Sequence, residues 1–174
     1  MNSHTVRLLT KHDFIELGDI HARCFGDFAW SSSTFEDYFI LPEWAGVIGF
    51  CVEKPKKVCD LTNTLELQRR LSGFIIGRTT YDINDVFTIA VDPCDHGKGV
   101  GTALLDAYLN AISTDCMLEV AKGNVTAIHL YEKFGFEVIT TRREYYDNPD
   151  PQMRDAYVMR KKTNVFEVAA QGSL

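Results

Sequence analysis

The 174-residue sequence lacks the features that mark membrane and exported proteins. No apolar run approaches the roughly 18 residues that a membrane-spanning helix needs. The first residues, MNSHTVRLLTKHDF, contain no apolar segment like that of a signal peptide. The cysteines number five, show no C-x-x-C spacing and lie mostly in apolar surroundings, which is typical of reduced core thiols. We therefore expect a cytoplasmic protein that does not bind membranes.

An excess of positive charge is also missing from the chain. It has 18 Lys and Arg against 24 Asp and Glu, a net charge of −6. This balance argues against nucleic-acid binding and favours a cationic substrate or partner, although solubility alone explains the same excess. With 45% hydrophobic residues and no repeats, a chain of this length is expected to form one domain with a sizeable core. No metal site is predicted.

Helices and strands alternate along the chain, which predicts an α/β fold. The predicted strands are residues 5–9, 45–53, 71–80, 84–91, 116–120, 136–145 and 155–161, and the predicted helices are residues 11–24, 34–41, 100–112 and 124–134. The polar segment 54–70 is too long for a tight hairpin turn, so we expect it to be an insertion between two strands. The domain is predicted to span residues 1–162, followed by a C-terminal tail at 163–174.

The stretch Asp95 to Gly101 reads DHGKGVG and lies between an apolar strand and a predicted helix. Glycines at alternate positions let backbone N–H groups converge, and the helix N-terminus adds a positive dipole end. The G-x-G-x-x-G dinucleotide fingerprint fails at Thr102, and the P-loop fails at Gly99, where Ser or Thr is needed. The N–H groups of residues 97–102 therefore predict a site for a different pyrophosphate. A turn that only reverses the chain is the alternative.

The surrounding residues supply a resemblance. FTIAVDPCDHGKGVGTALL resembles the acetyl-coenzyme A signature of the GNAT acetyltransferases, [Arg/Gln]-x-x-G-x-[G/A], with His96 in the first place of that motif. LEVAKGNVTAIHLYEKFGFEVITTRREYY, followed by DAYVM, is similar to the RimI-type ribosomal-protein-alanine N-acetyltransferases. The resemblance covers about residues 5–161. It implies a GNAT fold, with a mixed, mostly antiparallel sheet of six to seven strands and about four helices on both faces.

The resemblance also implies a cosubstrate and the residues that bind it. Acetyl-coenzyme A is expected on the backbone of the strand end, on the glycine loop and beside a helix cap. These residues are Ile89, Ala90, Val91, Gly97, Lys98, Gly99, Val100, Gly101, Thr102 and Asn124. Lys98 is equally expected as a solvated lysine. His96 departs from Arg or Gln, which is tolerable if that place contributes its backbone N–H, and it also fits a plain exposed histidine.

Glu119 is the predicted general base. Its counterpart in the RimI pattern is the proposed proton acceptor, and an α-ammonium with a pKa of about 7.7 to 8.0 must lose a proton before it can attack a thioester. Alternation places Glu119 with Met117 on one side of its strand. A structural ion pair at a strand end is the alternative.

Tyr131 is the predicted general acid. It follows Glu119 at the spacing found in the RimI pattern, and a phenol can protonate a departing thiolate. Its spacing with Ile128 and Phe134 also fits a core stripe, so a core tyrosine is the alternative.

Two further groups of residues could meet an acceptor. Arg142, Arg143, Tyr145 and Tyr146 are expected at the mouth of a peptide groove or in a charged hairpin. The acidic residues Glu36, Asp37 and Glu43 are expected either to attract a basic peptide or simply to be solvated.

The sequence thus predicts acetyl transfer to the N-terminal α-amine of a protein, with a ribosomal protein as the expected partner. Two rival functions remain: a GNAT enzyme that acts on a small amine or a lysine side chain, and a non-catalytic acyl-coenzyme A-binding module. The sequence does not distinguish a monomer from a homodimer.

Overall fold

The computed structural model describes residues 4–40, 46–59, 65–80 and 82–163. The chain forms two compact units. The first consists of Met1–Ile76 and Thr88–Tyr108, and the second of Gly77–Phe87 and Leu109–Leu174. Most of the predicted tail and the acidic residue Glu43 lie outside the described residues. The prediction of a single domain over residues 1–162 stays a prediction.

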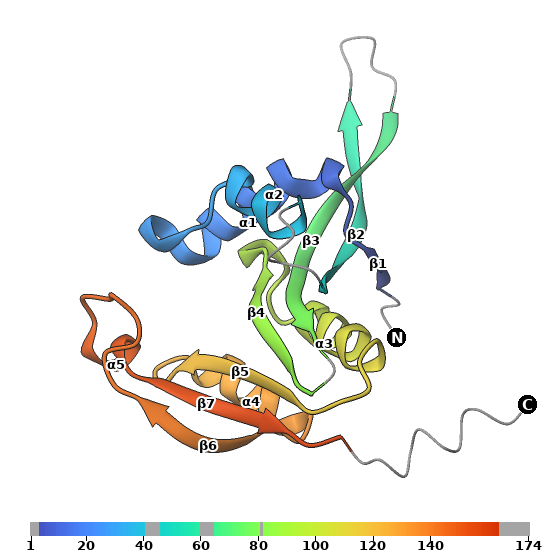
Figure 1. Ribbon diagram of the computed structural model, residues 1–174. Helices are drawn as coiled ribbons and strands as arrows, with labels where there is room; N and C mark the ends of the chain where they lie inside the picture. Colours follow the sequence, from blue (N-terminus) through green and yellow to red (C-terminus); the bar gives the residue numbers. More distant parts are fainter. Residues whose placement is uncertain (1–3, 41–45, 60–64, 81, 164–174) are drawn as a thin grey trace, which may run out of the picture. The chain divides into compact units, whose positions relative to one another are not determined.

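The described residues form seven strands and five α-helices (Figure 1). The strands are β1 (Thr5–Leu8), β2 (Val47–Cys59), β3 (Leu65–Thr79), β4 (Asn84–Val91), β5 (Cys116–Ala121), β6 (Glu137–Arg142) and β7 (Ala156–Lys161). The helices are α1 (Phe14–Phe25), α2 (Ser32–Ile40), α3 (Val100–Asn110), α4 (Val125–Lys133) and α5 (Pro151–Arg154). The strand order is β1-β2-β3-β4-β5-β7-β6. The antiparallel pairs include β1–β2, β5–β7 and β6–β7, whereas β4–β5 is parallel. The predicted α/β fold with a mixed, mostly antiparallel sheet is therefore confirmed.

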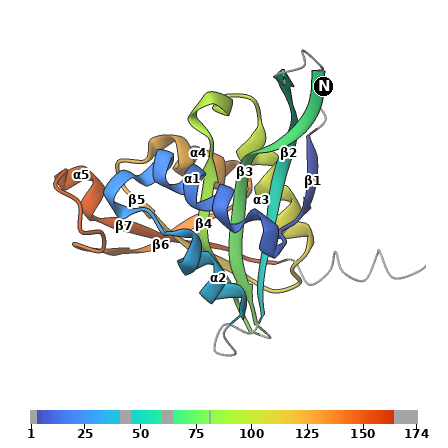
Figure 2. The same ribbon diagram turned by 90° about the horizontal axis from the view of Figure 1, so that it is seen from above.

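In the first unit, α1 and α2 lie against the sheet (Figure 2). They contact it through aromatic side chains. The Phe35 ring meets the Phe74 ring edge-on at 5.4 Å between centroids, and His21 stacks on Phe74 at 6.2 Å. Burying such large rings away from water stabilises the unit by roughly 25 cal/mol per Å² of apolar surface. Leu104 and Leu105 of α3 are also buried. His21 reaches the strand that leads into the glycine loop, because its Nε2 lies 3.3 Å from the Thr88 hydroxyl on β4.

In the second unit, β5 is the central strand. It pairs with the beginning of β4 from Asn84 to Val86 and with the whole of β7 (Figure 1). Its side chains alternate between buried and half-buried positions, with Leu118 and Val120 in the core. The edge strand β6 exposes all of its side chains. The alternation leaves the Glu119 side chain on the half-buried face of β5.

Three predicted elements differ from the structure. The chain was expected to leave the sheet after Glu53, but β2 continues to Cys59 and β3 begins at Leu65, so much of 54–70 is strand. The strand expected to reach residue 145 ends at Arg142, because Glu144 adopts a positive φ of 50° and turns the chain. The short helix α5 was not predicted. Helix α4 and its Asn124 cap are confirmed.

Two classes of feature are absent from the part of the chain that the structure describes. None of its helices has the length and apolar character needed to cross a membrane. Within the same described residues, His, Cys, Asp and Glu side chains form no group of three or more that could hold a metal ion.

Candidate functional site

The glycine loop of the first unit presents backbone N–H groups at the start of α3. After β4, a 3₁₀ turn over Pro93–Asp95 leads into the loop, and α3 begins at Val100. Gly97 and Gly99 have φ of 72° and 82°, a backbone conformation that side chains with a Cβ adopt at a cost. A Cβ added at Gly97 would meet no atom within 4 Å, so the space beside the loop is open. The first turn of α3 has N–H groups without helical partners, which suits an anion such as a pyrophosphate.

The strand end beside the loop is half-buried. Ile89 and Val91 are half-buried and Ala90 is buried, in an alternation that runs unbroken through β4. The β4–β5 register comprises Asn84 to Val86, so the ladder to β5 does not use the backbone of these three residues. The other side of the strand end is occupied, because the N–H of Asp92 donates to the Ser72 carbonyl at 2.9 Å. The backbone of Ile89 to Val91 thus has one edge outside the β5 ladder, on which the Val91 carbonyl accepts the contacts described next.

His96 has a defined role within the loop. Its Nε2 lies 2.9 Å from the carbonyl oxygen of Val91. Because a carbonyl only accepts, Nε2 carries the proton in this contact. The Cys24 thiol donates to the same carbonyl at 3.2 Å. The side chain at position 96 therefore fastens the loop to the end of β4, a role that the sequence did not reveal.

Lys98 is directed back into its own loop. Its ammonium donates to the Cys94 carbonyl at 2.7 Å and to the Asp95 carboxylate at 3.0 Å. Its own carbonyl lies 2.7 Å from His4 Nε2. Asp95 is 1% exposed, and its carboxylate also contacts Lys54 and Arg70. Lys98 thus forms an ion pair within its own loop, and its contact with a cosubstrate stays a prediction.

Glu119 lies in the second unit, near Arg142 at the end of β6 and Tyr146 at the start of the β6–β7 connection. Its Oε1 is 3.3 Å from the guanidinium of Arg142, which stacks over the Tyr145 ring at 5.3 Å. The Tyr146 hydroxyl donates to the backbone carbonyl of Glu119 at 3.3 Å. The Glu119 side chain is 26% exposed, so water or a substrate can reach the carboxylate. An ion pair, which was the structural alternative for Glu119, is thus present, but it leaves the carboxylate accessible.

Tyr131 is buried in α4, with its ring 5.8 Å from that of Phe136. Burial raises the pKa of its phenol, and electrostatic interactions with Tyr146 and Cys116 raise it further. The phenol therefore stays protonated at neutral pH, which is the state that a proton donor needs. Tyr131 thus lies in the core, as the alternative prediction had it. This position is compatible with a role as an acid.

Asn124 caps α4. Its Oδ1 accepts a hydrogen bond from the N–H of Ala127 at 3.2 Å, as expected for an N-cap. The side chain is exposed, so the cap leaves its amide nitrogen accessible.

The predicted site residues fall into two sets, one in each unit. The first unit brings together the strand end and the glycine loop; the second holds Glu119, Asn124 and Tyr131. Sequence reasoning placed Arg142 and Tyr146 at the mouth of a peptide groove or in a charged hairpin, not beside Glu119, and it did not select Asp95. The motif RREYY was a signal for Arg142 and Tyr146, whereas no signal marked Asp95, because its partners lie 25 and 41 residues away.

Comparison with known proteins gives one family. A family model described as an acetyltransferase (GNAT) domain matches residues 36–138. The [ribosomal protein bS18]-alanine N-acetyltransferase of Haemophilus ducreyi is 34% identical over 96 residues, which are 53% of this chain and 66% of that protein. Its namesake from Escherichia coli is 36% identical over 94 residues, 52% of this chain and 63% of that protein. These sequence matches span slightly less than two thirds of each relative.

Among solved structures, the chain is similar to the crystal structure of the ribosomal-protein-S18-alanine N-acetyltransferase from Escherichia coli. The TM-score is 0.73 and the identity 27%, and the match covers 93% of this chain and 95% of that one. Arabidopsis thaliana NAA60 in complex with a bisubstrate analogue matches with a TM-score of 0.71 at 18% identity, over 93% of this chain and 99% of that one. The latter likeness concerns the fold alone.

Proposed function

Because the chain belongs to the GNAT family of acetyltransferase domains, we propose that it transfers the acetyl group of acetyl-coenzyme A to the N-terminal α-amine of a protein. The acceptor that the similarity favours is a ribosomal protein, since two relatives carry the name of a bS18-alanine N-acetyltransferase. The observation that carries the proposal is an accessible carboxylate at Glu119 in the same unit as a buried, protonated phenol at Tyr131.

The donor is proposed to bind in the first unit. Its pyrophosphate suits the N–H groups of residues 97–102 at the start of α3, and the open space beside Gly97 supports this fit. Its amide-containing arm suits the backbone edge of Ile89 to Val91 that lies outside the β5 ladder. A backbone N–H of that strand, aimed at the thioester oxygen, stabilises the charge that develops there during attack.

The acceptor amine must lose a proton before it attacks. Near neutral pH much of an N-terminal amine is an ammonium, with a pKa of about 7.7 to 8.0. The Glu119 carboxylate takes one of its protons, directly or through a water molecule. The neutral amine then attacks the thioester carbonyl carbon, a C–N bond forms and the C–S bond breaks. No acyl-enzyme is involved.

The departing sulfur needs a proton. Tyr131 donates its phenolic proton to the thiolate. The tyrosinate is then reprotonated by solvent or by the proton that the amine releases. The raised pKa of Tyr131 keeps the phenol in its donor form throughout the neutral range. Tyr146 supports the arrangement, because its hydroxyl donates a hydrogen bond to the backbone carbonyl of Glu119.

The test is turnover of the purified chain with acetyl-coenzyme A and short peptides that differ only in a free or blocked N-terminus. Release of the coenzyme thiol and the mass of the product report the reaction. Acetylation of the free α-amine is expected. Acetylation of small amines or lysine side chains alone would assign the rival enzyme class, and tight cosubstrate binding without turnover would indicate a binding module.

Two substitutions test the roles of the predicted acid and base. Glu119→Gln and Tyr131→Phe are each expected to lower kcat at pH 7 by about 100-fold, the lower range for general acid–base catalysis. The Glu119→Gln loss should shrink above pH 8, where the amine is already neutral in solution. Glu132→Gln and Tyr157→Phe, on α4 and β7 of the same unit, are matched controls that should retain activity. Wild-type kcat in either test variant would refute the role assigned to that residue.

A further inference from the structure

We propose that Asp95 is a positioning residue: its buried carboxylate holds the glycine loop in its binding conformation by joining the loop to strands β2 and β3. The inference rests on the proposed function, since it concerns how the cosubstrate site is maintained. It assigns a role to residues Lys54 and Arg70 at the edges of the segment that the sequence presented as an insertion without a function.

The contacts of Asp95 come from three directions. Lys54 on β2 reaches Oδ1, Arg70 on β3 donates to Oδ2 at 2.6 Å, and Lys98 in the loop donates to Oδ1 at 3.0 Å. Asp95 itself is 1% exposed, while the three cations are between 23% and 52% exposed. One carboxylate therefore connects two neighbouring strands with the loop that follows β4, and all of these residues belong to the first unit.

A second carboxylate extends the cluster. Asp92 is 5% exposed; it accepts from Arg23 of α1 at 2.9 Å and lies 3.5 Å from Arg70. Its other oxygen accepts the N–H of Cys94 at 2.9 Å, which fixes the turn that carries Asp95. Arg70 thus lies between both carboxylates. The cluster spans α1, β2, β3 and the turn before the glycine loop.

Burial makes this arrangement depend on geometry. A carboxylate that is removed from water is stable only when it is paired and hydrogen-bonded. Burial alone would raise the pKa of Asp95, but the hydrogen bonds from Lys54 and Lys98 outweigh it, so the pKa lies well below its ordinary value. The charged state is therefore satisfied only while the strands and the loop are in register. Lys98 adds a second tie, because the same ammonium donates to the Cys94 carbonyl.

The place of Asp95 in the chain explains why loss of its hydrogen bonds should affect the glycine loop. Asp95 directly precedes His96, whose side chain binds the end of β4, and Gly97, whose N–H belongs to the proposed anion site. Loss of the carboxylate charge frees Lys54, Arg70 and Lys98 to turn to solvent. The loop then samples other conformations, and the cosubstrate has to select the competent one, which weakens apparent affinity without changing the chemical step.

The experiment measures acetyl-coenzyme A binding and turnover for Asp95→Asn, which keeps the shape and removes the charge. The dissociation constant and the KM for acetyl-coenzyme A are expected to rise about tenfold, as for loss of a charged hydrogen bond, with kcat at saturation unchanged. Asp115→Asn is the matched control. It removes a carboxylate that holds Arg160 at 2.8 Å and the Thr163 N–H at 2.8 Å in the second unit, and it should leave both constants unchanged.

Lys54→Met and Arg70→Met provide a second measurement if Asp95→Asn does not fold. Each should raise the KM for acetyl-coenzyme A, and Lys54→Met should not add to the effect of Asp95→Asn in a double variant, because Lys54 acts through the Asp95 carboxylate. Unchanged affinity in folded Asp95→Asn, or fully additive effects, would overturn the positioning role. Absence of acetyl-coenzyme A binding by the wild-type chain would instead refute the proposed function.

Discussion

At the scale of single residues, burial changes the protonation of His21, which belongs to no sequence motif. It is 3% exposed and stacks on Phe25 and Trp30 at 4.2 and 5.2 Å between ring centroids. Its Nδ1 accepts the N–H of Trp30 at 2.9 Å, so the neutral ring carries its proton on Nε2, 3.3 Å from the Thr88 hydroxyl. Burial lowers its pKa from 6.5 to about 4.

The stability of the protein should therefore fall between pH 7 and pH 5. The folded state keeps His21 neutral, whereas the unfolded chain binds a proton near pH 6.5. The stability that the neutral His21 contributes to the fold is complete above pH 6.5 and is lost as the pH falls toward 4. The free energy of unfolding, measured with urea, should drop by about 2 kcal/mol over this interval. The carboxylates of Asp13 and Asp95 do not interfere, because their unfolded pKa is 3.8.

His21→Gln is the control for that measurement. It removes the titrating group and keeps a side-chain acceptor for the Trp30 N–H. The variant should be less stable at pH 7 but should lose much less stability between pH 7 and pH 5. An equally steep loss in His21→Gln would assign the pH dependence to another group.

The candidate site residues that the sequence predicted are those that lie in local sequence motifs. Glu119, Tyr131 and the glycines belong to short motifs with characteristic spacing. Asp95 and Arg142 act through partners that the fold brings from distant segments, such as Lys54 for Asp95. Contacts between long side chains from distant segments produce no periodic pattern in the sequence, so these roles could be recognised only in the structure.

At the scale of elements, the glycine loop depends on backbone conformations that other residues adopt at a cost. Ala at position 97, where φ is 72°, should cost at least about 1 kcal/mol of stability through backbone strain alone, because no neighbour lies in the way. Gly97→Ala is also expected to raise the KM for acetyl-coenzyme A several-fold, since relief of the strain moves the N–H groups of the loop. Steady-state kinetics and thermal unfolding measure the two effects.

Gly26→Ala separates strain from binding. Gly26 follows α1 with a φ of 57°, and a Cβ there also meets nothing within 4 Å. This variant should lose stability as Gly97→Ala does but keep the wild-type KM for acetyl-coenzyme A. If Gly26→Ala raised the KM for acetyl-coenzyme A as much as Gly97→Ala does, the effect could not be assigned to binding by the glycine loop.

Element boundaries show where sequence patterns fail. Strands β2 and β3 extend into the polar segment 54–70, because neighbouring strands are joined by backbone hydrogen bonds, which need no apolar alternation of side chains. Strand β6 ends early, because the N–H of Glu144 donates to the Asp155 carboxylate at 3.1 Å and holds a turn there. Helix α4 was predicted well because its cap and its apolar spacing are both local signals.

At the scale of the whole molecule, the charge of −6 should influence the rate with a basic acceptor. Opposite charges attract over about 10 Å at 0.1 M salt and over less at higher concentrations. The value of kcat/KM for a basic peptide should therefore fall several-fold between about 0.05 and 0.5 M NaCl, whereas that for a neutral peptide should change little. Enzyme assays at constant acetyl-coenzyme A, saturating at every salt concentration, measure this difference.

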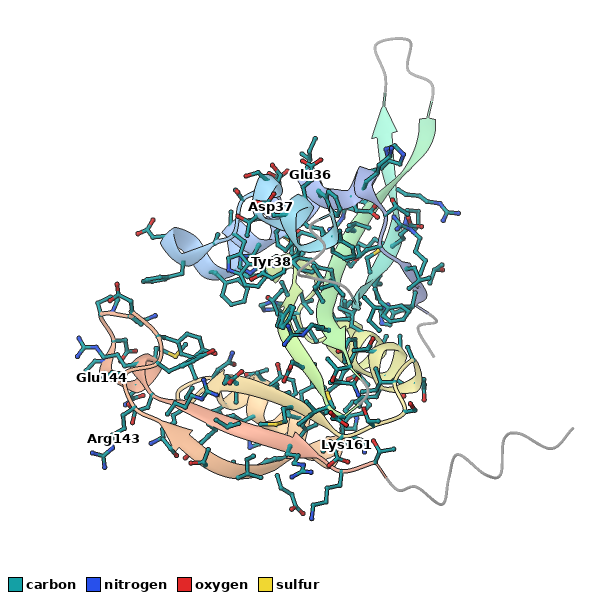
Figure 3. All side chains as sticks on the ribbon, in the orientation of Figure 1. Glu36, Asp37, Tyr38, Arg143, Glu144 and Lys161 are labelled. Carbon is teal, nitrogen blue, oxygen red and sulfur yellow. The ribbon has the colours of Figure 1, made fainter. Side chains whose placement is uncertain are left out.

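The double variant Glu36→Gln with Asp37→Asn localises that effect. Both side chains project from α2 into solvent, whereas Arg143 projects from the turn after β6 (Figure 3). If the α2 carboxylates guide the acceptor, the double variant should show a weaker salt dependence with basic peptides. An unchanged slope would leave the exposed carboxylates of α2 with a role in solubility only.

The fold class and the family were accessible from the sequence because alternation, glycine spacing and the later motif agree. The division into two units was not accessible. It follows from which segments pack together, and β4 contributes its second half to the first unit and its first half to the second.

This interleaving has a consequence for how the gene can be cut. The chain passes from one unit to the other three times, at Ile76, at Phe87 and at Tyr108. A truncation at Phe87 leaves both units incomplete, whereas a fragment that ends at Tyr108 holds the whole first unit together with a piece of the second. Neither unit corresponds to one continuous stretch of coding sequence, so neither can be transferred to another protein as a single uninterrupted gene segment.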